Sequence, residues 1–357
     1  MSFALIAFLL TQLFGLFHHS PAVSTTTPTD PIHRLATKAP RPPKKQLPRM
    51  NGVNFMAPQM KADNMGLQPL RQLNANWVAL TPFAFMDANE PNIQFPARET
   101  HWGNRPENLG QLVKEAREAQ LQIMLKPHFW IREQGWIGGL SLSQKDWKRW
   151  EAQYFDFMLR MARQAEIHQI EVLCVGVELK TAIQNRPYFW PRLIRAIRKV
   201  YSGQLTYAAN WDHYELINFW HLLDFIGIDA YFPLSQSRTP QIGTMVKEWR
   251  SIARKLKRFS KRKRKPIIIT EYGYRSCDFA CWNQWEIEFL PDHANINLRA
   301  QVNGYQAFYQ ALWREKWLAG MFLWRWYGEQ NKGGPNHSNY TPQNKPVEDV
   351  ISSWYGM

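Results

Sequence analysis

Two glutamates, Glu178 and Glu271, stand where apolar runs of the sequence end. Glu178 follows VLCVGV and Glu271 follows PIIIT. An unpaired carboxylate is costly to bury, so each glutamate needs a reason for its position. A salt bridge that caps the strand would be one reason. A catalytic pair would be another, because hydrolysis of a glycosidic bond uses one protonated acid and one ionised carboxylate, roughly 5–5.5 Å apart in retaining enzymes.

Other polar or aromatic residues stand at the ends of further apolar runs. They are Lys126 and His128 in LKPHFW, Asn210 and Trp211 in YAANW, Tyr231 in DAYF and Trp324 in FLWRW. Such side chains can hydrogen-bond sugar hydroxyls or stack on a pyranose ring. Each could also be a satisfied core residue. We expect no metal and no cofactor, because no second histidine or carboxylate stands at ligand spacing from His128.

The runs that carry these residues predict eight strands. They cover residues 52–57, 76–85, 121–130, 171–179, 205–210, 222–232, 266–273 and 320–326. Amphipathic segments typical of helices separate most of them, such as residues 105–120, 145–168, 191–201 and 297–315. Strands that alternate with helices pair in parallel through right-handed crossovers, and eight of them close a barrel. We therefore predict an α/β fold, a (β/α)8 TIM barrel, over residues 50–357.

Such a barrel would bring the polar strand ends together. The C-terminal ends of its strands form the active-site face. Glu178 ends the fourth run and Glu271 the seventh, on opposite sides of the ring, so the two carboxyl groups could face each other across its mouth. A doubly wound open sheet is the alternative. It usually has a glycine-rich phosphate turn after its first strand, where this chain has PQMKADNMG.

Four strand-end segments resemble one enzyme family. VGVELK, TYAANW, IDAYFPLS and ITEYGYRS, in this order, are similar to motifs of glycoside hydrolase family 113, a β-mannanase family within a large clan of retaining TIM-barrel hydrolases. The similarity extends from about residue 50 to 330. It implies that Glu178 is the general acid/base, that Glu271 is the nucleophile, and that the substrate is a β-1,4-linked mannan or manno-oligosaccharide.

The resemblance also implies roles for the neighbouring residues. Tyr231 would orient Glu271, as the sixth-strand tyrosine does in related barrels. Many members of the clan have asparagine directly before the acid/base, where this chain has Val177. We expect Asn210 to contact the sugar 2-hydroxyl instead.

The remaining candidate residues would bind the sugar. Lys126 and His128 would donate hydrogen bonds to its hydroxyls, and Trp324 would form the floor of the subsite next to the cleavage point. Platform and packing roles are both open for the tryptophans of nearby loops, which are Trp130, Trp136, Trp211, Trp282 and Trp285. Another β-linked glycan as substrate is an alternative, and so is a sugar-binding barrel without catalysis. The latter would not need both glutamates.

The N-terminal part of the chain differs in composition from the rest. Residues 1–17 contain the apolar stretch SFALIAFLLTQLFGLF, which is short for a membrane span and typical of a signal peptide or an uncleaved anchor. A buried helix is the alternative. Residues 18–49 are rich in Pro, Thr, Lys and Arg and predict a disordered or extended linker. We expect an exported monomer, periplasmic or extracellular, that associates with the membrane if the apolar segment is retained.

Positive charge is concentrated in one segment. The chain has 44 Lys and Arg against 29 Asp and Glu, a formal net charge of +15. Residues 254–265 carry nine of these positive charges and no negative one. We interpret the segment as the solvated end of an amphipathic helix, where the helix dipole favours cations. Attraction to anionic surfaces or envelope polymers is the alternative. Nucleic acid is not an expected partner, because no recognition motif accompanies the charge.

The three cysteines are too few for a disulfide scaffold. Cys174 lies in an apolar run and predicts a buried thiol. Cys277 and Cys281 stand four residues apart in a polar, aromatic segment, where they could close a small disulfide in an exported protein.

Overall fold

The computed structural model describes residues 49–357, except residues 59–63, 88–89, 96–101, 103–104, 106–107, 133–135 and 288–294. The predicted signal or anchor segment, residues 1–17, lies outside the described residues, as does all of the predicted linker except Arg49. Within the described ranges, no helix is both long and apolar enough to cross a membrane.

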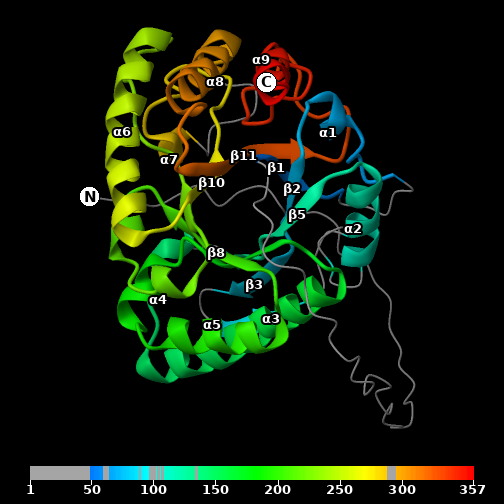
Figure 1. The fold of residues 1–357 in the computed structure, drawn as a ribbon, viewed down its shortest axis with the longest axis vertical. Helices are drawn as coiled ribbons and strands as arrows, with labels where there is room; N and C mark the ends of the chain where they lie inside the picture. The colour runs from blue at the N-terminus through cyan, green and yellow to red at the C-terminus, as the bar shows by residue number, and fades with distance from the viewer. Residues whose placement is uncertain are drawn as a thin grey trace, which may run out of the picture. The chain divides into compact units, whose positions relative to one another are not determined.

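Eight parallel strands close into a barrel, which confirms the predicted fold class (Figure 1). In the order of their hydrogen-bonded neighbours they are β1 (Met50–Met56), β11 (Leu318–Tyr327), β10 (Ile267–Tyr272), β9 (Ile226–Asp229), β8 (Gln204–Asn210), β7 (Val172–Val177), β5 (Gln122–Leu125) and β2 (Trp77–Leu80). Each corresponds to one of the eight predicted runs. Closure pairs β1 with both β2 and β11, so the barrel sheet has no free edge.

Helices pack around the outside of this barrel (Figure 1). They are α1 (Pro69–Gln72), α2 (Leu109–Glu118), α3 (Gln144–Ile167), α4 (Lys180–Asn185), α5 (Phe189–Val200), α6 (Ile242–Lys263), α7 (Gln284–Ile287), α8 (Leu298–Leu312) and α9 (Val347–Tyr355). Local interactions determine where several of these helices begin or end. The Ser143 hydroxyl accepts from the Asp146 N–H and caps α3, and Arg264 ends α6 with a left-handed φ of 53°. The basic segment 254–265 thus forms the last part of α6 and the two residues that follow it.

Two of the predicted strands are each divided at a proline. Pro82 separates β2 from β3 (Phe83–Asp87), and Pro127 separates β5 from β6 (His128–Arg132). Proline cannot donate a ladder hydrogen bond, so it interrupts the pairing. Beyond the prolines, β3 and β6 pair in parallel with each other, and β4 (Glu90–Gln94) adds antiparallel to β3. The prediction of single strands over 76–85 and 121–130 was therefore wrong at these two points.

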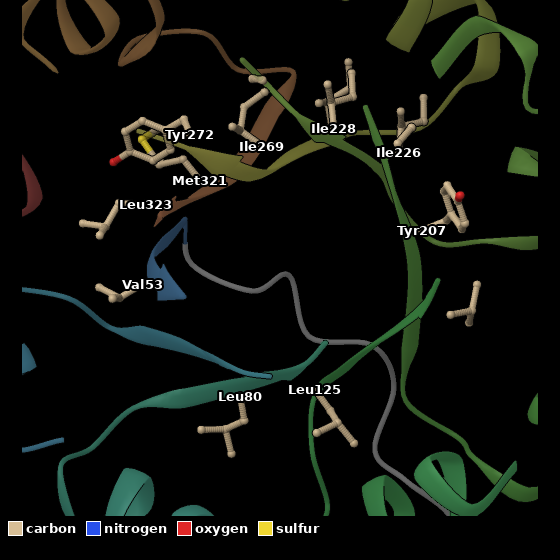
Figure 2. Close-up of a cluster of buried hydrophobic side chains, with 14 of the residues drawn as sticks. Val53, Leu80, Leu125, Tyr207, Ile226, Ile228, Ile269, Tyr272, Met321 and Leu323 are labelled. Carbon is tan, nitrogen blue, oxygen red and sulfur yellow. The ribbon is translucent and has the colours of Figure 1, made fainter. Parts of the chain in front are cut away.

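The side chains of the barrel strands form two apolar layers. One layer lies between the strands and the helices. Figure 2 shows members of it, such as Val53, Leu125 and Ile228, pointing away from the centre of the ring. A second cluster contains Met50, Trp77, Ala79, Met124, Val172, Phe225, Ile268 and Phe322. Because successive strand residues point to opposite faces, this second cluster fills the barrel itself. Lys126 stands two residues after Met124, so its side chain points to the same, inner side of the barrel.

Gly227 in β9 leaves no room for a side chain. A Cβ at this position would lie 2.3 Å from the carbonyl oxygen of Tyr207 in β8. Backbone cannot yield without opening the ladder between the two strands, so we expect Gly227→Ala to lower the free energy of unfolding by about 1–3 kcal/mol. In a domain of this size the thermal midpoint would fall by several degrees.

Gly243→Ala is the matched control for this substitution. Gly243 lies in the first turn of α6, and a Cβ there meets nothing within 4 Å. This variant should melt at or slightly above the midpoint of the unsubstituted protein, since alanine favours the helix. Equal midpoints for the two variants in a thermal unfolding series would contradict the steric argument.

Candidate active site

An irregularity in β10 turns Glu271 toward the inside of the barrel. Ile267 and Ile269 belong to the outer layer, and Ile268 lies inside. Strict alternation would place Thr270 inside and Glu271 outside. The register with β9 shifts between Ile269 and Glu271, and both Thr270 and Glu271 make hydrogen bonds to residues of the barrel interior. Irregularities of this kind commonly re-aim side chains next to active sites.

Glu178 follows β7 directly and has a left-handed backbone with φ of 51°. Its N–H donates to the carbonyl oxygen of Ala208 in β8 over 2.9 Å, so the neighbouring strand holds this conformation in place. A non-glycine residue in a sparsely populated backbone region costs on the order of 1–3 kcal/mol, and such residues gather at functional sites. The backbone at Glu178 therefore fits a functional role better than a purely stabilising one.

Three side chains surround the Glu271 carboxylate, which is only 6% exposed. Lys126 Nζ makes a short hydrogen bond to Oε1, and the Tyr231 hydroxyl donates to Oε2 over 2.9 Å. His128 Nε2 lies 4.0 Å from Oε1. Both donors fix the orientation of the Glu271 carboxylate. The bond from Tyr231 is the contact that its predicted orienting role requires.

Asp229, at the end of β9, is a fully buried carboxyl group that the sequence prediction missed. Its Oδ1 accepts from Thr270 Oγ1 over 2.7 Å and lies 3.5 Å from Lys126 Nζ. Burial and the negative charge of Glu271 raise the pKa of Asp229 to about 7. Burial alone would lower the pKa of Lys126, but the charges of Asp229 and Glu271 raise it above its ordinary value. Lys126 is therefore a buried cation that two carboxyl groups share.

Glu178 has the opposite environment to Glu271. Burial of its carboxyl group, together with the negative charges of Asp229 and Glu271, raises the pKa of Glu178 well above its ordinary value. A hydrogen bond that Trp136 Nε1 donates to Oε2 over 2.8 Å acts in the other direction without reversing the shift. Glu178 can therefore keep its proton where an ordinary glutamate has lost it. A protonated carboxyl group beside a second, hydrogen-bonded carboxylate is an arrangement suited to an acid and a nucleophile.

Trp136 offers a direct test of this assignment. Its indole N–H stabilises the ionised form of Glu178, so Trp136→Phe should raise the pKa of Glu178 further. A general acid must be protonated, and the rate falls as the pH rises through its pKa. The alkaline limb of the profile of kcat/KM against pH should therefore move to higher pH. At the optimum, loss of one hydrogen bond should reduce kcat/KM by about two- to tenfold.

Trp130→Phe is the control for this experiment. Trp130 is 45% exposed and Trp136 is 44% exposed, but of these two tryptophans only Trp136 donates to Glu178 in the described part of the chain. The control should keep the position of the alkaline limb. A limb that stays in place in Trp136→Phe, or moves to lower pH, would contradict the assignment of Glu178 as the acid.

His128 lies in an aromatic stack at the mouth of the barrel. Its ring centroid is 5.0 Å from that of Phe83 and 5.7 Å from that of Trp324. Burial and the nearby charges of Lys126 and Arg325 lower the pKa of His128 well below its ordinary value, so the imidazole is neutral. Among the described residues, His128 Nε2 has no hydrogen-bond partner. His128 Nε2 is itself buried, so its predicted bond to a sugar hydroxyl stays a prediction.

Asn210 and Trp211 stand at the end of β8. Asn210 pairs in register with Asp229, and its Oδ1 accepts from the Trp211 N–H over 2.7 Å. The Trp211 ring stacks on that of Trp285, with centroids 5.7 Å apart and planes inclined by 17°. Flat aromatic surfaces of this kind can stack on pyranose rings. The sugar contacts of Asn210, Trp211 and Trp324 stay predictions.

The buried position of Lys126 changes what its side chain is placed to do. We predicted that it donates to a sugar hydroxyl, and that contact remains a prediction. In the structure the side chain is fully buried, and its ammonium contacts Glu271 and Asp229. The ammonium is thus placed to act on the charge of the Glu271 carboxylate.

Two further sequence predictions concern the cysteines and metal binding. Cys174, Cys277 and Cys281 are buried free thiols, so the disulfide left open by the sequence is not formed in this structure. In the ranges that the structure describes, no group of three or more His, Cys, Asp and Glu side chains could hold a metal ion.

Comparisons with known proteins agree with the barrel fold. A family model described as Glycoside Hydrolase Family 113 matches residues 55–345. The family 113 β-mannanase from Alicyclobacillus acidocaldarius is 24% identical, with a TM-score of 0.74 over 87% of this chain and 98% of that chain. Another family 113 β-1,4-mannanase is 23% identical, with a TM-score of 0.75 over 87% of this chain and 99% of that chain. At these identities the structural likeness shows the fold alone. None of the curated proteins matches significantly.

Proposed function

The chain belongs to glycoside hydrolase family 113, and from this premise we propose that it cleaves β-1,4-mannosidic linkages of mannan or manno-oligosaccharides with retention of configuration. Membership of the family makes the protein a glycosidase with a carbohydrate substrate. The mannosidic linkage comes from the β-mannanases that it resembles. The observation that carries the mechanism is the contrast between Glu178, whose environment raises its pKa and favours a proton, and Glu271, whose carboxylate accepts hydrogen bonds from an ammonium and a phenol.

In the first step, Glu271 attacks the anomeric carbon while Glu178 gives its proton to the leaving glycosidic oxygen. The C–O bond to the leaving sugar breaks, and an ester bond forms between the sugar and Glu271. The Tyr231 hydroxyl and the Lys126 ammonium hold the carboxylate in place before attack. Once Glu271 is esterified, its negative charge is lost, so Lys126 keeps Asp229 as its remaining anionic partner.

In the second step, Glu178 acts as a base. Loss of the Glu271 charge removes one cause of the raised pKa of Glu178, so its carboxylate becomes easier to maintain. Glu178 then takes a proton from water, the water oxygen attacks the anomeric carbon, and the ester bond breaks. Two inversions give the product the configuration of the substrate.

Hydrolysis assays with the full chain test the substrate. The protein is incubated with β-1,4-mannan, cellulose, xylan and laminarin, and reducing ends are measured. We expect the fastest release from mannan. Faster release from another polymer would replace mannan by that β-linked glycan. Release from none of them would favour a sugar-binding barrel without catalysis.

Proton NMR of the first product separates the two possible mechanisms. A retaining enzyme releases the β-anomer first, and mutarotation then adds the α-anomer. An initial α-anomer would mean that water attacks directly, which would refute the role of Glu271 as nucleophile.

We further propose that the protein is exported as a monomer and that its N-terminal apolar segment directs this export. Cell fractionation of a C-terminally tagged chain would locate it. Activity that stays with the cytoplasmic fraction would argue against export. Size-exclusion chromatography with light scattering would measure the oligomeric state.

A further inference from the structure

A groove of about 1280 Å³ lies beside α6, α8 and α9, away from the carboxyl groups. Its lining includes Trp313 and Trp317, from the segment between α8 and β11. Trp317 directly precedes β11, so the groove is at the end of the barrel where that strand begins. Glu271 and Trp324 lie near the opposite ends of their strands. A ligand in this groove would therefore not compete for the catalytic site.

Basic side chains from two segments line this groove. Arg250, Lys257 and Lys261 follow each other along α6 at spacings of seven and four residues, which places them on one face of the helix. Arg314 and Lys316 come from the segment after α8. The groove therefore receives positive charge from separate parts of the chain.

Little negative charge offsets these cations. Glu315 is the one acidic side chain among the described residues that line the groove. It is already engaged, because Lys257 Nζ lies 3.4 Å from it and Trp317 Nε1 donates to it over 2.5 Å. The helix dipole of α6 does not explain the whole set, since Arg250 is far from the C-terminal end of α6 and Lys316 lies outside it.

The groove also has aromatic walls. Tyr309 and Trp354 stack with ring centroids 5.6 Å apart, and Trp313 lies 5.7 Å from Trp354. Trp317 is buried, and Trp313 and Trp354 are only partly exposed. A bilayer surface is flat and favours aromatic rings that stand out from the protein. Recessed rings favour a ligand that enters a concavity.

We propose that this groove binds an acidic glycan chain, separately from the glycan that is hydrolysed. Cations can pair with the carboxylates of such a chain, and aromatic walls can pack against the faces of its sugar rings. The volume exceeds the range of about 300–1,000 Å³ that is usual for small-molecule pockets, and suits an oligosaccharide segment. Bound in this way, the enzyme would be retained on an acidic matrix while its catalytic face remains open.

Calorimetric titration of the full chain with an oligogalacturonate tests the proposal. A manno-oligosaccharide of the same length is the neutral comparison. The groove variant combines Arg250→Gln, Lys257→Gln and Lys261→Gln. The control variant combines Lys255→Gln, Arg258→Gln and Arg262→Gln, which removes the same charge from exposed positions of α6 that do not line the groove. We expect the groove variant to bind oligogalacturonate at least tenfold more weakly and the control to stay within about threefold of the unsubstituted chain.

Equal losses in the two variants would mean that the binding is only a response to net charge, and would overturn the proposal. Unchanged binding in the groove variant would overturn it as well. A third overturning result is a groove variant that loses binding only to phosphatidylglycerol vesicles, because this would point to a membrane as partner. Mannan hydrolysis should be the same in both variants, so failure of this proposal is distinguishable from failure of the proposed activity.

Discussion

Replacement of Glu271 by alanine is expected to abolish hydrolysis, with a fall in kcat of about 10⁵-fold or more, as for removal of other enzymatic nucleophiles. Without this carboxylate no covalent intermediate can form. Tyr231 and Lys126 are donors to its oxygens, and we do not expect either to replace it as the attacking group. Release of reducing ends from mannan over hours at high enzyme concentration measures the residual rate.

Azide offers a positive test of the same variant. A small anion can occupy the space that the carboxylate leaves and attack the anomeric carbon from that side. On a substrate with an activated leaving group, Glu271→Ala plus azide should therefore give a glycosyl azide of inverted, α configuration. Glu118→Ala, at an exposed position at the end of α2, is the control and should keep full activity. Hydrolysis that survives Glu271→Ala would refute the catalytic assignment.

The variant should also remain folded, for a reason that the site itself supplies. Removal of one partner from a buried ion pair is usually costly, because a charge is left uncompensated. Here the Glu271 charge is one cause of the raised pKa of Asp229. Without Glu271 that pKa falls, Asp229 ionises more readily, and it can balance the Lys126 ammonium alone. Circular dichroism of Glu271→Ala should therefore match that of the unsubstituted protein.

The barrel could be predicted because its sequence pattern, an apolar run followed by an amphipathic segment, is repeated. Each strand is an apolar run, and the amphipathic helices between the runs fix parallel pairing. The parts that were missed depend on single residues. Pro82 and Pro127 each divide one run, which lets β3 and β6 leave the barrel and form a separate sheet with β4. Their effect could have been read from the missing N–H of proline.

For the candidate site, the position of the two glutamates at strand ends could be predicted from the sequence, but their detailed contacts could not. A glutamate after an apolar strand is conspicuous, and topology places the ends of the fourth and seventh strands at one face. The inward turn of Glu271 was not visible, because strict alternation in PIIITEY places Thr270 inside and Glu271 outside. The ladder irregularity that changes this arises from pairing with β9.

Asp229 and the bond from Trp136 to Glu178 were missed for different reasons. Asp229 lies in FIGIDAYF, where an acidic residue in an apolar run was a usable signal of a buried charge network. Trp136 reaches Glu178 from the segment before Ile137–Gly139, and no periodicity in the sequence predicts the path of such a segment. Lys126 was identified as a site residue, but its burial between two carboxyl groups depends on the closed barrel.

Replacement of Glu178 by alanine should produce a loss that depends on the leaving group. With mannan, the departing sugar needs a proton, and kcat should fall by about 10²–10⁴-fold. With a dinitrophenyl mannoside the leaving group departs without a proton, so Glu271 is still esterified at close to the normal rate. Hydrolysis of the ester then lacks its base and becomes limiting. A burst of dinitrophenol followed by slow turnover, with a low apparent KM, is the expected result in stopped-flow measurements.

Two further measurements should assign the effects of Glu178→Ala to the loss of the Glu178 carboxyl group alone. The alkaline limb of the profile of kcat/KM against pH should disappear, because the group that must stay protonated is gone. Azide should restore turnover and give a glycosyl azide of retained, β configuration, since it replaces water in the second step on Glu271. The opposite configurations expected from the two variants place each carboxyl group on its own side of the sugar.

If Glu178→Ala lost the same fraction of its activity on substrates with every leaving group, the separate roles of Glu178 as acid and Glu271 as nucleophile would be contradicted. Such a loss would mean that removal of Glu178 disturbs Glu271 as well, through the charge coupling between Glu178, Asp229 and Glu271. The cluster would then titrate as one unit whose apparent pKa values belong to no single residue. The Trp136→Phe profile distinguishes these cases, because its indole bonds to Glu178 and not to Glu271. A shift confined to the alkaline limb in that variant assigns the limb to Glu178.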